Sequence, residues 1–429
     1  MVIVGRGVLG YSLYFLRLMR PMKIASSVSI ASDSRMAAEE AATEVAAALD
    51  GAAVDLAFLF ISSHHTSHAE EIGEIIREKV PAEHFVGCTA EGVLGGDREY
   101  ADSPGLSLWA ASLPGVDVSS CRLEATDESR NALLLEAMTE MHEPATLVLM
   151  ADPFSVVVED LVDALSEKRP ELVFAGGMAS GSSSPTGNRV YYGKEVFERG
   201  GSAVLFRGGA SVSTVVSQGC RPFGKPLVVT SCEDNMIKEL GGESAWQKFV
   251  EQVEDTEDTD RERLTEGLHV GRAVDSRSAS EGAGNFLVRG VLGFVKETGA
   301  MMVGDIPRAG QTIQFHLRDP ASASQEMEAL LQGRKDELAH PIAGALLFTC
   351  NGRGPRMFDK PHHDASVVSK VFDAPPLAGF FAAGEVGPVG DKSFLHGFTA
   401  VTVLFHSSSG NDRSGGEPRE AAGERDPAE

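Results

Sequence analysis

Three glycine-rich turns carry the side chains of this sequence that are best suited to hold a small molecule. Glycine lets the backbone approach a ligand closely, although it also serves tight packing between a strand and a helix, and that alternative stays open. The turns are Gly87-Cys88-Thr89-Ala90-Glu91-Gly92, Ser217-Gln218-Gly219-Cys220-Arg221-Pro222-Phe223-Gly224, and Cys350-Asn351-Gly352-Arg353-Gly354 together with Gly384-Glu385-Val386-Gly387-Pro388. The predicted ligand-binding residues are Cys350, Asn351, Gly352, Arg353, Gly354, Glu385, Gly387, Cys88, Thr89, Glu91, Gly92, Cys220 and Arg221.

Charged side chains of both signs occur in these turns. The guanidinium groups of Arg353 and Arg221 could each pair with a carboxylate or phosphate through two parallel hydrogen bonds. The carboxylates of Glu91 and Glu385 could receive an ammonium group. A site with both signs suits a zwitterion, so an amino acid is one ligand that we expect.

Two cysteines raise the alternative of catalysis. Cys88 and Cys350 each lie near the end of a predicted strand, where a helix N-terminus could lower a thiol pKa. A nucleophile also needs a base, for which His64, His65 and His396 are candidates. Buried cysteine is more often a small apolar residue, so we prefer a protein without catalytic residues. The alternative is a cysteine-dependent hydrolase or acyl-transfer enzyme that uses Cys350 or Cys88.

Two further motifs resemble a metal site and a dinucleotide site, but neither assignment is favoured. His64, His65 and His68 have metal-like spacing, but they begin a predicted helix, where solvated polar residues are common. A GxGxxG match in the first ten residues lacks the continuous strand–helix–strand unit of a dinucleotide site, because Arg20-Pro21 interrupts it. We expect no metal and no cofactor, and we expect residues 1–21 to be a non-native or disordered extension.

The composition limits the classes of partner. The chain has 429 residues, a formal net charge of -24 and 42% hydrophobic residues. Nucleic acid and anionic membranes need clustered Lys and Arg, so neither is an expected partner. The five scattered cysteines contain no CxxC pair and predict reduced thiols in a cytoplasmic protein. Polar residues 407–429 are typical of a disordered tail, and the charged run Glu254 to Arg263 of a linker or exposed loop.

The elements that position the turns belong to an internal repeat of the sequence. AFLFISS from Ala57, a helical pattern ending at Pro81 and HFVGCTAEGVLGG form a first strand–helix–strand unit. TLVLMAD from Thr146 begins a second unit at an offset of 89 residues, which relates Pro81 to Pro170. GALLFTC from Gly344 begins a looser third unit. The same offset of 89 residues relates Phe85 to Phe174, Gly87 to Gly176, Ala90 to Ala179, Gly92 to Gly181, Ile72 to Leu161 and Ile76 to Leu165.

The predicted fold class is α/β, with repeated strand–helix–strand units that form two related lobes with mixed sheets. Such units are right-handed, and they bring the carboxyl ends of their strands to one edge, where open sheets bind ligands. LSLWAA, AVLF and HGFTAVTVLF are expected to return antiparallel to them. Helices are also predicted over Arg35 to Leu49, Glu128 to Met141, Glu233 to Leu240, Ser324 to Leu331 and Asp364 to Phe372.

Five motifs in order resemble the FIST family. They are FVGCTAEGVLGG, FAGGMASGSS, SQGCRPFG, LLFTCNGRG and FFAAGEVGPVG, and residues 286–319 resemble the central segment of that family. The resemblance covers roughly Met22 to Phe405 and implies a FIST N-terminal domain over 22–250 and a FIST C-terminal domain over 251–406. It also implies a sensory module of signal transduction that binds small ligands such as amino acids.

Two expectations about the output follow from this resemblance. The sequence contains no segment that we can assign to an F-box, kinase, cyclase or methyl-accepting domain, so a downstream signalling protein is the expected partner. A scaffold that binds proteins through its surface, with a vestigial pocket, is a third alternative.

Overall fold

The computed structural model describes residues 21–125, 131, 144–208, 212–255, 258–264, 267–274 and 286–406. The predictions for the N-terminal extension before residue 21, the GxGxxG match, the tail from residue 407 and nearly all of the helix over 128–141 lie outside the described residues. Within them, the mixed α/β fold with repeated strand–helix–strand units is confirmed, including the third unit.

The first unit shows why the sequence forms these elements. Strand β2 is a run of apolar residues that is almost wholly buried, and helix α3 buries Ile72 and Ile76 on one face. Asp33 caps helix α2, because its side chain accepts a hydrogen bond from the amide of Met36. The unit consists of β1 (Lys23–Ser29), α2 (Ser34–Leu49), β2 (Val54–Ser62), η1 (Ser63–His68), α3 (Ala69–Lys79), β3 (Ala82–Ala90) and β6 (Leu106–Ser112).

The second and third units repeat this plan. In each unit two parallel strands are flanked by antiparallel ones, which confirms the expected returns. The second comprises β7 (Asp117–Leu123), β8 (Ala145–Ala151), α5 (Val158–Lys168), β9 (Leu172–Met178) and β12 (Gly201–Arg207). The third comprises β13 (Val212–Ser217), α8 (Pro320–Glu337), β21 (Ile342–Cys350), α9 (His363–Val371), β22 (Leu377–Ala382) and β25 (Ala400–His406).

One glycine in each unit fixes how the units superimpose. Gly87, Gly176 and Gly379 lie on the second parallel strand of their units, each opposite a leucine of the first. A Cβ atom at these glycines would come within 1.8 to 2.0 Å of the carbonyl oxygen of that leucine. Only glycine therefore fits without a shift of the backbone. The three positions are structurally equivalent, so the turns that follow them are equivalent too.

A hairpin passes from each unit to another, so the three sheets are interlocked. Hairpin β4 (Val93–Gly95) to β5 (Arg98–Tyr100) leaves the first unit and completes the sheet of the third. Hairpin β10 (Val190–Tyr192) to β11 (Glu195–Phe197) leaves the second and completes the first. Hairpin β23 (Glu385–Val389) to β24 (Lys392–His396) leaves the third and completes the second. The exchange is cyclic and produces three six-stranded sheets of equivalent strand order.

The three sheets enclose one apolar core, and the helices cover their outer faces. Phe58 of β2, Val148 of β8 and Phe348 of β21 all belong to this core, and the rings of Phe60 and Phe380 meet between two sheets with centroids 4.9 Å apart. Separate apolar clusters hold α2 and α3, α5, and α8 and α9 against their own sheets. We call this part of the molecule the three-sheet body.

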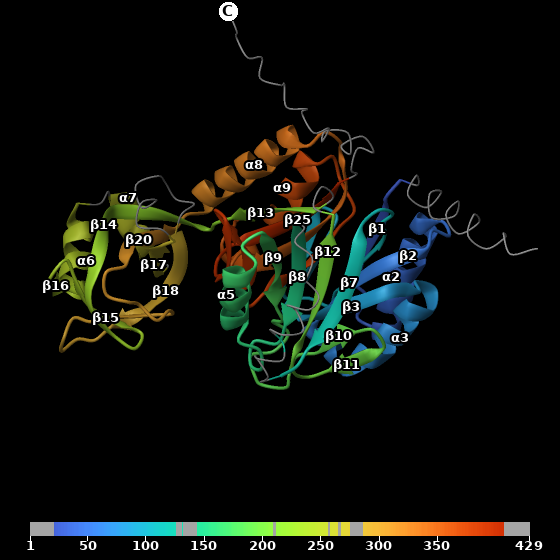
Figure 1. Ribbon diagram of the computed structural model, residues 1–429, viewed down its shortest axis with the longest axis horizontal. Coiled ribbons are helices and arrows are strands. Elements are labelled where there is room, and N and C mark those ends of the chain that lie inside the picture. The colour runs from blue at the N-terminus through green and yellow to red at the C-terminus, as the bar shows by residue number, and fades with distance from the viewer. Residues whose placement is uncertain are drawn as a thin grey trace, which may run out of the picture.

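A β-barrel is inserted between β13 and α8, and it lies beside the three-sheet body (Figure 1). Six antiparallel strands close on themselves because the long strand β14 pairs with both β20 and β15. The barrel has its own core, which includes Phe315 and Met301. Its elements are β14 (Cys220–Glu233), β15 (Met236–Leu240), β16 (Glu243–Ser244), α6 (Ala245–Glu254), α7 (Asp258–Arg263), β17 (Leu268–Ala273), β18 (Phe286–Phe294), β19 (Met301–Val303) and β20 (Thr312–Arg318).

Two sequence predictions in the barrel are wrong. The segment from Glu233 to Leu240 is a hairpin between β14 and β15 rather than a helix, because Asp234 adopts a positive φ of 49° and Ile237 pairs across to neighbouring strands. The charged run from Glu254 to Arg263 includes the short helix α7 instead of being only an exposed loop. Tertiary pairing outweighs local helix propensity in the first case.

Candidate functional site

The glycine turns of the three units meet at one end of the three-sheet body. Ser180, in the turn after β9, accepts a hydrogen bond from the backbone N–H of Glu91 at 2.8 Å and donates one to the carbonyl of Phe381. The amide of Phe381 donates to the carbonyl of Gly92 at 3.0 Å. The structure thus brings together the turns after β3, β9 and β22, and Ser180 joins all three. We call this place the turn junction.

Arg353 lies beneath the turn junction in a fully buried ion pair. Its Nε and Nη2 atoms each lie 2.8 Å from the carboxylate oxygens of Asp364, and both side chains have no exposed surface. Burial alone would raise the pKa of Asp364, but the charge and hydrogen bonds of Arg353 hold that pKa well below its usual range. A ligand carboxylate would have to displace Asp364 to reach this guanidinium. The two-pronged carboxylate that the sequence led us to expect is therefore supplied by the protein itself.

Glu385 is also buried and does not face an open pocket. Its Oε2 atom accepts hydrogen bonds from the amide and hydroxyl of Thr399, at 3.2 and 2.8 Å. Burial raises the pKa of Glu385 to about 8, against the opposing effects of Thr399 and of the Arg353 charge. Burial, together with the charge of Asp364, likewise raises the pKa of Glu99 to about 8. Glu385 is therefore largely uncharged at neutral pH, which weakens it as a partner for an ammonium group.

Only part of the predicted set has access to the surface at the turn junction. Glu91 forms an ion pair with Arg356, which is half exposed and donates at 2.7 Å to the carbonyl of Asn351. Thr89 is buried and accepts a hydrogen bond from the amide of Arg189 at 2.8 Å. The Glu91–Arg356 pair ties the first unit to the third, and the Thr89–Arg189 contact ties the first to the second. At the turn junction, Glu91 and Asn351 are the polar members with partial exposure.

Several glycines of the set are required by packing. A Cβ at Gly92 would lie 2.5 Å from the backbone of Ala101, and one at Gly387 would lie 2.6 Å from Val216. Gly352 lies against the ring of Phe398, and Gly354, with φ +55°, against the ring of Phe381. The packing interpretation thus accounts for these glycines.

The second predicted turn lies where the barrel joins the body. Arg221 pairs with Asp319 through Nε at 2.6 Å and also forms an ion pair with Asp260. Cys220 is buried at the start of β14. Arg221 therefore fixes the base of the barrel, and the neighbouring Gly219 packs against Phe398 and Arg353 of the third unit.

The cysteines and histidines proposed for chemistry are mostly buried. Burial raises the pKa of the thiols of Cys88 and Cys350 far above their ordinary value. His65 is buried, with Nδ1 2.9 Å from the hydroxyl of Ser34, and burial lowers its pKa. Across the described ranges, no group of three or more His, Cys, Asp or Glu side chains is arranged to hold a metal ion.

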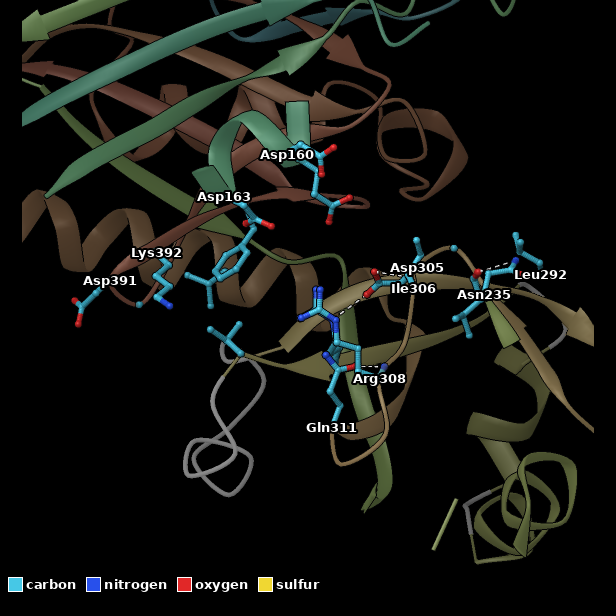
Figure 2. A pocket seen from close by; sticks show the side chains of 18 residues that line it. Asp160, Asp163, Asn235, Leu292, Asp305, Ile306, Arg308, Gln311, Asp391 and Lys392 are labelled. Atoms are coloured by element: carbon cyan, nitrogen blue, oxygen red, sulfur yellow. Dashed lines mark hydrogen bonds and ion pairs between the residues drawn. The ribbon is translucent and has the colours of Figure 1, made fainter. Parts of the chain in front are cut away.

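An open cleft lies elsewhere, between the barrel and the three-sheet body. This cleft has a volume of about 1190 Å³, and Figure 2 shows Asp160 and Asp163 of α5 on one wall, across from Arg308 and Gln311 of the barrel. The hairpin β23–β24 closes one end with Lys392. The residues around it are Glu159, Asp160, Asp163, Asn235, Arg272, Val274, Leu292, Val303, Gly304, Asp305, Ile306, Arg308, Gln311, Val389, Gly390, Asp391, Lys392 and Phe394.

The charges in the cleft are partly paired and partly free. Arg272 pairs with Asp305 at 2.9 Å; burial would raise the pKa of Asp305, but this arginine lowers it. Arg289 of β18 reaches Glu159 of α5 at 3.1 Å and so joins the barrel to the body. Within the described part of the chain, Arg308 and Lys392 form no ion pair and no side-chain hydrogen bond, and the same holds for Asp160, Asp163 and Asp391. Leu292 and Ile306 are 65% and 73% exposed beside them.

Sequence reasoning singled out none of the cleft residues as ligand contacts. The walls come from α5, from a hairpin of the third unit and from the barrel, which only the exchanged topology brings together. The only sequence feature that relates to the cleft is the repeat. It makes Glu159 and Asp163 the counterparts of Glu70 and Glu74, which lie 89 residues earlier.

Comparison with known proteins places the chain in a family. The FIST N domain matches residues 55–243 and the FIST C domain matches residues 245–388. The chain is 37% identical over 384 residues to the uncharacterized protein Rv0628c of Mycobacterium tuberculosis, across 90% of this chain and all of that protein. It is 35% identical to the uncharacterized protein Mb0898c of Mycobacterium bovis, across 90% of this chain and 99% of that one.

The two matched ranges meet beside β16, inside the barrel, while strands from both ranges share sheets of the body. The predicted boundary at 250/251 remains a prediction. Among the described residues no helix is long and apolar enough to cross a membrane. The resemblance seen in the five motifs is confirmed, and the chain belongs to the FIST family, with a FIST N domain followed by a FIST C domain.

Proposed function

We propose that this chain is a non-catalytic sensory protein that binds a small charged metabolite in the cleft between the barrel and the three-sheet body. FIST domains are associated with sensory and signal-transduction roles. The observation that carries the proposal is a cleft of about 1190 Å³ whose walls present unpaired charges of both signs. Ligand sites in proteins are concave, largely preformed and equipped with a few convergent polar groups.

The layout of the charges favours a zwitterion. The carboxylates of Asp160 and Asp163 can receive an ammonium group, and the guanidinium of Arg308 across the cleft can receive a carboxylate (Figure 2). Ile306 and Leu292 add exposed apolar surface to the barrel side of the cleft. Small-ligand pockets usually measure about 300–1000 Å³, so a ligand larger than glycine, such as an amino acid with a long side chain or a dipeptide, fills this cleft better.

Burial of the thiols supports binding rather than catalysis. A thiolate is the nucleophilic form of cysteine, and the raised pKa values of Cys88 and Cys350 keep both thiols protonated at neutral pH. Sγ of Cys350 lies 3.5 Å from the amide of Gly352 and 3.8 Å from Oδ1 of Asn351, and neither group is a general base. Cys350 also interacts with Glu385, but the raised pKa of Glu385, about 8, keeps that carboxyl largely protonated at neutral pH.

The two connections of the barrel offer a way to transmit binding. The chain enters the barrel after Gly219 and leaves it at Asp319, and the amide of Asp319 donates to the carbonyl of Gly219 at 3.4 Å. A ligand that bridges α5 and Arg308 would favour orientations of the barrel in which the cleft is closed. A downstream signalling protein in the cytoplasm that distinguishes these orientations would be the partner.

Binding assays with matched variants test this proposal. The twenty amino acids and a set of dipeptides are screened by thermal shift, and the Kd of each hit is measured by calorimetry. We expect at least tenfold weaker binding in Arg308→Ala and in Asp163→Asn, because each removes one of the two charge contacts. Arg356→Ala, outside the cleft, serves as the matched control and should bind normally.

Two outcomes would contradict the cleft as the site. The first is the absence of any saturable binding at millimolar concentration. The second is unchanged affinity in Arg308→Ala and Asp163→Asn combined with a loss in Glu91→Gln, which would return the ligand to the turn junction that the sequence predicted.

A further inference from the structure

A second opening lies on the first unit, in the position equivalent to the cleft. This groove has a volume of about 430 Å³ and lies between α3, the hairpin β10–β11 and strand β7. It does not involve the barrel. Its lining residues are Glu70, Glu74, Arg77, Arg122, Lys194, Glu195, Val196 and Phe197.

The repeat makes five of these residues counterparts of cleft residues. Glu70 and Glu74 of α3 correspond to Glu159 and Asp163 of α5 through the offset of 89 residues, and both helices have 11 residues. The hairpins β10–β11 and β23–β24 complete equivalent sheets. Both turn at a glycine with nearly the same positive φ, +59° at Gly193 and +60° at Gly390.

The residues after these turns correspond one to one. Lys194, Glu195 and Phe197 take the places of Asp391, Lys392 and Phe394. Each hairpin therefore offers one lysine, one carboxylate and one aromatic ring. In both places this set faces the acidic first half of a helix.

The positive charge in the groove comes from two arginines of the three-sheet body, whereas in the cleft it comes in part from the barrel. Arg122 of β7 pairs with Glu195 at 2.8 Å and lies over the ring of Phe197, 4.2 Å from its centroid. Arg77 donates to the carbonyl of Gly193 at 3.4 Å. These contacts fix the positions of both guanidinium groups, which line the groove. In the ranges that the structure describes, Lys194 and Glu70 form no ion pair and no side-chain hydrogen bond.

We propose that this groove is a second binding site for a zwitterion, with the ammonium group of the ligand at Glu70 and Glu74 and its carboxylate at Lys194 and Arg77. The proposal rests on the proposed function only for the pattern of charges that it shares with the cleft. Because the groove is much smaller than the cleft, it takes a compact ligand of the size of a single amino acid. The chain would then carry two sites for related ligands on equivalent elements.

Methyl NMR of the full chain separates the two sites in one titration. Val196 lines the groove, whereas Ile306 and Leu292 line the cleft, so labelled methyl groups report each site independently. The probes are glycine, 4-aminobutyrate and 6-aminohexanoate, which differ in the distance between ammonium and carboxylate. We expect the Val196 methyl signals to shift saturably with at least one probe. Lys194→Ala should weaken this response at least tenfold, while the ligand-free spectrum changes only for methyl groups near residue 194.

Matched variants make each outcome decisive. Lys392→Ala, at the position equivalent to Glu195, should leave the Val196 response unchanged. The proposal is overturned if Val196 shows no saturable shift with any probe, or if its Kd is unchanged in both Lys194→Ala and Glu74→Gln. Ile306 shifts without Val196 shifts would reject the groove and keep the cleft, and the reverse would reject the cleft for these probes.

Discussion

Two arginines three residues apart, Arg353 and Arg356, lie in opposite environments. Arg353 and its partner Asp364 have no exposed surface, whereas the side chain of Arg356 is 52% exposed in its pair with Glu91. Removal of one member of a buried pair leaves an uncompensated charge in the interior, but an exposed pair is screened by water. The same residue type therefore contributes very differently to stability at the two positions.

Substitution of each arginine by methionine, which keeps most of the side-chain volume, measures this difference. We expect Arg353→Met to lower the free energy of unfolding by about 3–5 kcal/mol and Arg356→Met by no more than about 1 kcal/mol. Adding Asp364→Leu to Arg353→Met should recover much of the loss, because both buried charges are then gone. Urea denaturation at pH 7 provides the measurement, and equal losses in the two single variants would contradict the assignment.

Glu385 should make stability depend on pH. Its pKa is about 8 in the folded protein, above the value of about 4.3 for an unfolded chain, so the native state holds an extra proton between these values. The stabilisation is complete below pH 4 and is lost as pH rises through 8, at up to about 1.4 kcal/mol per pH unit. Glu385→Gln should therefore gain stability relative to wild type at pH 8.5 compared with pH 5. An identical difference at both pH values would show that Glu385 ionises normally. Glu99 contributes a similar slope that this variant leaves in place.

At the scale of elements, the close approach of the two parallel strands in each unit depends on one glycine. We expect Gly379→Ala to cost at least about 3 kcal/mol or to prevent folding, because its Cβ would lie 1.8 Å from the carbonyl oxygen of Leu347. Gly290→Ala is the matched control, since Gly290 is also in a strand but has no atom within 4 Å of the added Cβ. That variant should change stability by less than about 1 kcal/mol. Thermal and urea unfolding of both proteins check the contrast, and a tolerated Gly379→Ala would mean that the strands can separate.

Local patterns predicted most elements, and they failed where distant partners decide. Buried runs such as β2 and β21, and helices such as α3 and α5, follow from apolar spacing and terminal proline. The hairpin at Glu233 to Leu240 does not, because its pairing with β14 and β19 outweighs a helix-compatible composition. The residue types likewise indicated that Arg353 could bind a carboxylate. They could not show that this carboxylate belongs to Asp364, eleven positions along the chain.

At the scale of the whole molecule, the exchange of hairpins was beyond sequence reasoning. The repeat revealed the units, but nothing local says that β4–β5 joins the sheet of the third unit and not that of its own. The cleft depends on the same exchange, because Lys392 reaches α5 only through a hairpin donated by the third unit. The segments after β3 and β9 do meet at strand β22, as Ser180 shows, yet they form a packed junction, and the predicted turn with Arg221 lies at the base of the barrel. The open space formed where a barrel was inserted beside the body.

The interlocked sheets imply that the three-sheet body unfolds as one unit. Each unit donates a hairpin to the sheet of another unit, so no unit can unfold without breaking strand pairs in a second sheet. The barrel shares only two chain crossings with the body and has its own core. Hydrogen exchange followed by mass spectrometry tests this, because local opening free energies appear as exchange rates. Arg353→Met, placed in the third unit, is the perturbation.

We expect this variant to accelerate exchange in β3, β9 and β22 to the same extent, by roughly 100-fold for a loss of about 3 kcal/mol. The barrel strands β17 and β20 should keep their wild-type rates, and Arg356→Met should leave all five strands nearly unchanged. Acceleration confined to β21 and β22 would contradict the coupling. It would mean that the third unit opens alone, and that the exchanged hairpins do not couple the unfolding of the three units.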